Sequence, residues 1–163
     1  MISPLYAANN MIRRANEQGV ILTNLKLQKL MYILYAKYHV DTNNPLFSNR
    51  FEAWQYGPVL SELYEIFKEE GSKSITEYRP DANGRMLVVS EAGDFGACFD
   101  YVWGNYARRT ASYLVDMTHG KVENPEQRKV AWQKAVEEHG IGAFIEDCEI
   151  IKDGEMWFAE GRH

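Results

Sequence analysis

The chain has 163 residues, of which 45% are hydrophobic and 25% are charged, and its formal net charge at pH 7 is −5. This composition excludes a largely disordered chain, and the length suffices for one domain that buries about 70% of its unfolded-chain surface. The negative charge excludes a strong general attraction to nucleic acid or to an anionic membrane.

The first predicted helix begins at Ser3-Pro4, which is typical of an N-cap followed by a proline at the first helical position. Its apolar residues recur along one side until Gly19. A second helix is predicted from Thr23 or Asn24, and we expect it to lie at the centre of the fold. Apolar residues recur at the spacing of one buried stripe at Leu27, Leu30, Met31, Leu34, Tyr35 and Tyr38. Lysines fall on or beside its polar side at Lys26, Lys29 and Lys37.

A short strand is predicted over residues 47–56, where Trp54 and Tyr56 share one face. Gly57 permits a tight reversal, and Pro58 fits the first position of another helix, which ends at Gly71. The stretch therefore predicts a strand-to-helix junction, with the two aromatic residues anchoring the strand against the second helix.

Residues 72–85 are polar, and Asn83-Gly84 is a strong hairpin signal. A second strand is predicted over residues 85–89, with residues 75–78 as a candidate third strand. Ser90 can cap the next helix. Its inner side carries Phe95, Phe99, Val102, Trp103 and Tyr106.

The last part of the chain predicts further helices. One runs from about residue 110 to 118, and Asn124-Pro125 supplies a cap and a first-turn proline for the next, which ends at Gly140. Beyond it, helical spacing competes with a possible hairpin turn at Asp153-Gly154, and we favour a helix followed by a loosely ordered tail from about residue 153. The predicted fold is mainly α: a compact bundle of about six or seven helices with a small two- or three-stranded antiparallel sheet, in one domain over residues 1–163.

No common nucleotide-binding, nucleophile or zinc-protease motif is present, and the four histidines have no ligand spacing. His119 has two interpretations: an acid–base group poised by Asp116, or a histidine that interacts favourably with the end of its helix, which we favour. Glu52 beside Trp54 lacks a second carboxylate at a defined spacing. We therefore predict no enzymatic activity, no metal and no cofactor.

The N-terminal residues lack the basic and apolar regions of a signal peptide, and no apolar stretch approaches the roughly 20 residues needed to span a bilayer. We favour an interpretation of Cys98 and Cys148 as buried thiols in a reducing compartment, with a disulfide between them as the lesser alternative. We expect a cytoplasmic protein that does not enter a membrane.

Two long stretches resemble the Panacea domain family of SocA- and GepA-type antitoxin proteins. The first, residues 22–40, contains KLQKL followed by a tyrosine, and the second, residues 45–68, contains EAWQYGPV and an early LY. A later Thr-His pair also matches, although the family's adjacent proline and tryptophan are separated here by six residues. The family-motif residues with an expected structural role are Leu27, Leu30, Trp54, Gly57, Pro58, Thr118, His119 and Trp132.

This resemblance implies a mostly helical domain without enzymatic activity or cofactor, which neutralises a protein toxin, often encoded beside it, by direct binding. Many relatives carry an added DNA-binding module, for which we expect no room here, so direct nucleic-acid binding is not expected. The candidate toxin contacts are Lys26, Lys29, Glu52, Tyr56 and Tyr64. The alternative is a phage or mobile-element protein that binds and blocks a host protein, or delivers it as an adaptor. Oligomeric state stays open.

Overall fold

The computed structural model describes residues 1–159, and this part of the chain forms seven α-helices and one two-stranded sheet. The mainly α prediction is confirmed. The elements are α1 (Pro4–Gln18), α2 (Asn24–Thr42), β1 (Glu52–Trp54), β2 (Gly57–Val59), α3 (Ser61–Phe67), a 3-10 turn (Lys68–Glu70), α4 (Gly93–Tyr106), α5 (Ala111–Thr118), α6 (Ala131–His139) and α7 (Asp147–Trp157).

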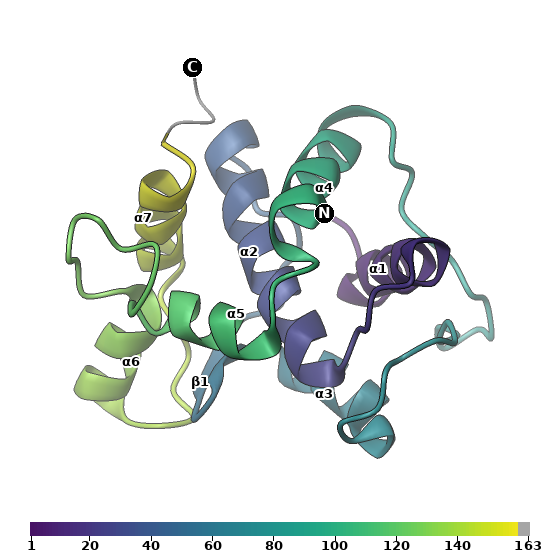
Figure 1. The fold of residues 1–163 in the computed structure, drawn as a ribbon, viewed down its shortest axis with the longest axis horizontal. Coiled ribbons are helices and arrows are strands. Elements are labelled where there is room, and N and C mark those ends of the chain that lie inside the picture. The colour runs from purple at the N-terminus through teal and green to yellow at the C-terminus, as the bar shows by residue number, and fades with distance from the viewer. Residues whose placement is uncertain (160–163) are drawn as a thin grey trace.

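Helix α2 is the centre of the fold. It lies between α7 and α4, and α1, α3, α5 and β2 also pack against it (Figure 1). Leu27 and Leu30 are fully buried, as predicted. The expected polar side does not exist, however, because packing from several directions also buries the lysines. Lys26, Lys29 and Lys37 retain 8%, 0% and 5% exposure.

The strand prediction is correct only in part. β1 and β2 form an antiparallel hairpin in which Trp54 pairs with Gly57, so Gln55 and Tyr56 make the turn. Gly57-Pro58 therefore begins a return strand rather than a helix, and α3 begins at Ser61. The other side of β1 is occupied by residues 142–145, with Ala53 N–H donating to Ala143 O at 2.7 Å.

Residues 71–92 pass around the outside of α1 without forming a strand (Figure 1). The strands predicted at 75–78 and 85–89 are therefore wrong. Asn9 and Asn10 of α1 are fully buried and provide the hydrogen bonds that a neighbouring strand would have made. The Asn10 carboxamide accepts from Val89 N–H at 2.7 Å and donates to Val89 O at 2.9 Å. Asn9 binds the backbone of Arg79 in the same two-way manner.

The starts of three helices have local causes. Helix α5 lies where it was predicted, and Thr110 caps it by accepting from Tyr113 N–H at 3.0 Å. Helix α4 begins at Gly93 rather than after Ser90. Helix α6 begins at Ala131 rather than at Pro125, because the Asn124 side chain folds the preceding loop by bonding to Gly120 O and to both backbone groups of Arg128.

The C-terminal helix is longer than expected. Asp153 and Gly154 lie inside α7, so the alternative hairpin is wrong and no loose tail begins at residue 153. Asp153 is buried and accepts from Arg128 Nε at 2.6 Å, while Gly154 lies against Ala36 of α2. Residues 160–163 of the expected tail lie outside the described residues.

Of the two cysteines, Cys98 is buried as expected, but Cys148, in the first turn of α7, is exposed, so that expectation is wrong for Cys148. None of the described helices combines the length and the apolar character that crossing a membrane requires.

Candidate functional site

Two neighbouring residues of α2 hold the hairpin through its backbone. Gln28 Oε1 accepts from Leu60 N–H at 3.0 Å, and Lys29 Nζ donates to Pro58 O at 2.8 Å. Both side chains are buried, so these hydrogen bonds form in a low-dielectric interior and fix the hairpin against α2. The KLQKL and EAWQYGPV stretches thus form one structural unit.

Gly57 allows this close approach. Its φ of +110° lies in a region that L side chains rarely adopt. A Cβ atom there would lie 2.7 Å from Lys29 Cε and 2.8 Å from Thr118 Oγ1. Thr118 itself donates to Val115 O at 2.9 Å. Position 57 therefore requires glycine for two reasons: its φ is positive, and a Cβ atom would clash with Lys29 and Thr118.

Lys29 is inaccessible to a partner in the folded protein. Its ammonium contacts a carbonyl oxygen, and burial lowers the pKa of Lys29 from 10.5 to about 7. Lys26 is also largely buried, and burial, followed by the charge of Arg108, lowers its pKa. We infer that Lys29 has a structural role and that, contrary to the prediction, it does not contact a toxin.

His119 and Trp132 form the other support of the hairpin. Their rings stack with centroids 3.8 Å apart, and Trp132 Nε1 donates to Trp54 O at 2.7 Å. His119 follows the last residue of α5. Burial, then the charges of Lys121 and Lys29, lowers the pKa of His119, while Asp116 opposes this more weakly. The lowered pKa favours the neutral imidazole, which lies stacked against the Trp132 indole.

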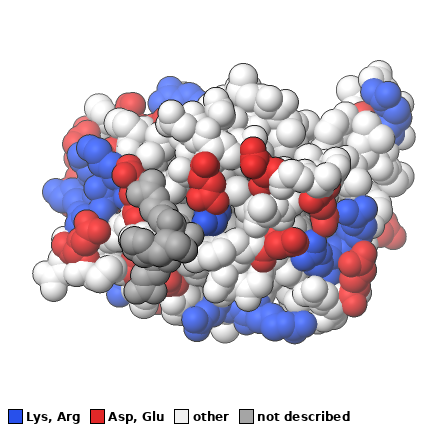
Figure 2. Space-filling model, turned by 90° about the horizontal axis from the view of Figure 1, so that it is seen from above, with Lys and Arg blue, Asp and Glu red and all other residues white. Residues whose placement is uncertain are grey.

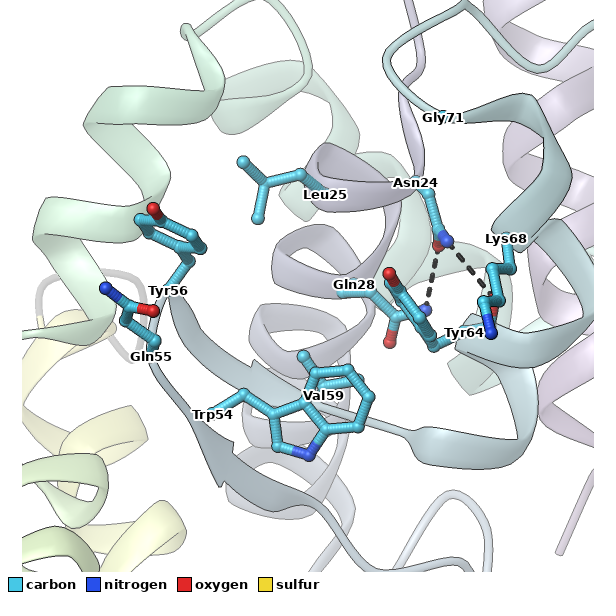
Figure 3. A pocket seen from close by; sticks show the side chains of 10 residues that line it. All are labelled: Asn24, Leu25, Gln28, Trp54, Gln55, Tyr56, Val59, Tyr64, Lys68 and Gly71. Carbon is cyan, nitrogen blue, oxygen red and sulfur yellow. Dashed lines mark hydrogen bonds between the residues drawn. The ribbon is translucent and has the colours of Figure 1, made fainter. Parts of the chain in front are cut away.

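A groove of about 410 Å³ lies beside the hairpin, between the first turns of α2 and helix α3 (Figure 3). Tyr56 and Leu25 face each other at one side of it, and the Trp54 and Tyr64 rings meet edge to face with centroids 4.9 Å apart. The lining residues are Asn24, Leu25, Gln28, Trp54, Gln55, Tyr56, Val59, Tyr64, Lys68 and Gly71. The groove is mainly apolar and has the size of a ligand-binding pocket.

Two amide side chains that line the groove, Asn24 and Gln28, are already paired within the protein. Asn24 Nδ2 donates to Tyr64 O at 3.2 Å, and Gln28 Nε2 donates to Asn24 Oδ1 at 3.1 Å (Figure 3). A group bound against these two residues therefore meets no unused amide there, while the exposed Gln55 side chain also lines the groove. The mainly apolar surface of the groove can bind an apolar side chain by excluding water.

The structure brings two predicted contact residues, Tyr56 and Tyr64, to this groove. Glu52 lies on β1 and accepts from Trp54 Nε1 at 3.2 Å. Sequence reasoning missed several lining residues, although the position of Leu25 at the edge of the predicted stripe could have indicated it. The missed residues include Leu25, Gln55, Val59 and Lys68.

Basic and acidic side chains are interspersed on the face shown in Figure 2, without a continuous basic area there. Within residues 1–159, no group of three or more His, Cys, Asp or Glu side chains is placed to hold a metal ion. The groove is therefore our candidate binding site, and its lining is mainly apolar.

Residues 27–123 match the family Antitoxin SocA-like, Panacea domain, which covers more than half of the chain. The chain belongs to this family. It is 32% identical over 117 residues to Antitoxin SocA of Caulobacter vibrioides (strain NA1000 / CB15N). That alignment covers 69% of this chain and 62% of the relative, so the chain spans less than two thirds of the relative's length. A search of solved structures found no match.

The resemblance read from the sequence is confirmed by this match. The matched residues include the α2 residues that hold the hairpin, the hairpin itself and the Thr118-His119 pair. Trp132 lies beyond the matched range, yet it contacts both His119 and Trp54.

Proposed function

We propose that this protein is an antitoxin that neutralises a protein toxin by binding it directly in the cytoplasm. Membership of the SocA-like Panacea family and the 32% identity to an antitoxin support this role. We further propose that the toxin is encoded by a neighbouring gene, and that neutralisation is stoichiometric and needs no catalytic turnover.

The division of the hairpin into a buried and an exposed part supports direct binding as the mechanism. Lys29, Gly57 and Pro58 are buried and hold the hairpin in place, whereas Tyr56 at its tip is 60% exposed. Tyrosine is enriched at the energetic centres of protein interfaces. We propose that the toxin contacts the groove at Tyr56 and Tyr64, with Glu52 and the small exposed part of Lys26 at its margin.

Neutralisation in this proposal requires no nucleic acid. The net charge of −5 and the interspersed charges in Figure 2 offer little attraction to phosphate groups. A complex that survives nuclease treatment and purification at elevated salt is therefore expected.

The test is co-expression of the protein with each neighbouring gene, followed by growth measurement and co-purification. We expect one neighbour to be toxic alone, and growth to recover when the two proteins are present at about one-to-one ratio, together with a stable complex. Growth recovery without a complex would contradict direct neutralisation. Absence of any toxic neighbour, together with capture of a host protein, would favour the blocking or adaptor role instead.

A further inference from the structure

Two residues at the open side of the groove do not take part in holding the hairpin against α2. Tyr56 is 60% exposed and Leu25 is 36% exposed, and they face each other there (Figure 3). Trp54 and Tyr64 line the inner part, where their rings pack against each other. A group entering the groove would therefore contact rigid aromatic surface within and two exposed apolar side chains at the mouth.

The pairing of the inner amides indicates what kind of group this is. A sugar, nucleotide or other polar metabolite is oriented by convergent polar groups with unused hydrogen-bonding capacity. Here Asn24 and Gln28 bond to each other, to Tyr64 O and to Leu60 N–H. An apolar group loses nothing by meeting these two satisfied amides, whereas a polar group would find partners only at the tyrosine hydroxyls and at the exposed Gln55 and Lys68.

The charge at the groove indicates what lies beside that apolar group. Lys68 is the one charged residue among the ten described residues that line the groove. Its side chain is 60% exposed, and its ion pair with Glu65 is long, 3.8 Å, and equally exposed. The amino-terminal end of α2, at Asn24 and Leu25, adds partial positive charge at the same groove. The groove is thus complementary to a carboxylate at its edge.

We propose that the groove receives one bulky aliphatic or aromatic side chain from an exposed segment of the partner protein, and that Lys68 pairs with an acidic side chain beside this anchor. The proposal rests on the proposed function, since it names the part of the toxin that is recognised. A protein segment fits better than a free apolar molecule, because a free ligand is normally enclosed over most of its surface whereas Tyr56 remains largely open here.

The probe is a set of synthetic peptides obtained by selecting a random displayed library against the purified full chain. We expect enriched peptides to share a Leu, Met, Phe or Trp with an Asp or Glu nearby. In fluorescence anisotropy, Tyr56→Ala should weaken binding by about tenfold or more. Lys68→Glu should weaken it by about two- to fivefold, and a peptide with Lys in place of the acid should recover binding to that variant.

Two variants control for general surface effects. Met86→Ala removes an apolar side chain of similar exposure, 58%, outside the groove, and Lys121→Glu reverses an exposed charge elsewhere. Both should bind the peptides as the unaltered protein does. All four variants should keep the circular dichroism spectrum and melting temperature, since each changed side chain is exposed.

Several results would overturn the proposal: no enriched peptides, enriched peptides without an acidic residue, or equal binding by Tyr56→Ala and the unaltered protein. Dimerisation that Tyr56→Ala abolishes would assign the groove to a second copy of this chain. Once a toxin is in hand, a complex unaffected by Tyr56→Ala and Lys68→Glu would reject the groove while leaving the antitoxin function intact. Peptide binding that depends on Tyr56 and Lys68, without any toxin that the protein neutralises, would support the groove and reject the antitoxin function.

Discussion

Lys29 and Gly57 pack against each other beneath the hairpin, and each limits the residue type that fits at the other position. The lysine reaches Pro58 O only because no Cβ atom lies at position 57, where it would stand 2.7 Å from Lys29 Cε. The glycine in turn takes a φ of +110° that closes the turn after Tyr56. The contact between Lys29 and the hairpin thus explains why the KLQKL and EAWQYGPV motifs occur in the same chain.

Gly57→Ala should destabilise the protein by about 2–4 kcal/mol, because it adds backbone strain and a steric clash with Lys29 and Thr118. Gly142→Ala is the matched control, since its φ is +93° and nothing lies within 4 Å of its Cβ position. The free energy of unfolding in denaturant, measured for both variants, separates backbone strain from the steric clash. Equal losses in the two variants would show that strain alone matters at Gly57.

The buried amine of Lys29 should make stability depend on pH. Burial lowers the pKa of Lys29 from 10.5 to about 7, so between these values the unfolded chain binds more protons than the folded chain. Stability contributed by this residue therefore rises with pH above about 7, by at most about 1.4 kcal/mol per pH unit, and is independent of pH below that.

Lys29→Met should remove this rise, measured as the free energy of unfolding at pH values from 7.5 to 8.5. This interval lies above the titration of histidine, and Cys98, whose pKa is raised by burial from 9.0 to about 12, contributes equally to the slopes of both proteins. Lys68→Met, which removes an exposed amine, should keep the slope of the unaltered protein. A Lys29→Met protein with an unchanged slope would show that the amine is hydrated in solution.

At the scale of elements, helix α1 holds residues 79–89, a segment that forms no strand, by hydrogen bonds from its side chains. Two successive asparagines on its inner side, Asn9 and Asn10, hold residues 79–89 by side-chain amides. Glu91 then joins the segment to the same helix through Arg13 and Arg14, at 2.7 and 2.8 Å. The segment is ordered by one helix face rather than by a sheet.

Asn10→Ala should cost about 1–3 kcal/mol, because it leaves the Val89 N–H and carbonyl without their partner in a partly buried place. The amide hydrogen of Val89 should then exchange with solvent faster than in the unaltered protein. Asn16→Ala is the control, since that side chain makes one exposed bond, to Thr76 O. Retained protection at Val89 would show that the segment is held by other contacts.

At the scale of the whole molecule, α2 connects the two halves of the chain. It packs against α1 and α3 from the first half and against α4, α5 and α7 from the second. Residues 142–145 pair with β1, so the C-terminal part also completes the sheet. We therefore propose that residues 1–163 form one cooperative domain.

This arrangement predicts one unfolding transition. Far-ultraviolet circular dichroism and tryptophan fluorescence should report the same denaturant midpoint, because the tryptophans lie in both halves of the chain: Trp54, Trp103, Trp132 and Trp157. Single-tryptophan variants, with the others changed to Phe, test each region. Separate midpoints for Trp54 and Trp157 would mean that the halves unfold independently.

The sequence by itself determined the helical class, the central position of α2, the chain reversal at Gly57 and the family. These features depend on signals between residues that are close in the sequence: the apolar spacing of Leu27 and Leu30, the Thr23 cap, and a glycine where φ is positive. It also indicated two groove residues, Tyr56 and Tyr64, because aromatic residues near a turn are candidates for an interface.

Only the tertiary structure decided which charges are buried and which segments pair. Lys29 has the local sequence of an exposed helix residue, and it is buried because β2 and α5, distant in the chain, close over it. Residues 85–89 have a strand pattern but meet Asn10 instead of another strand, while β1 finds its outer partner in residues 142–145. Burial and hydrogen-bond pairing depend on what lies across the fold, and local sequence does not contain that information.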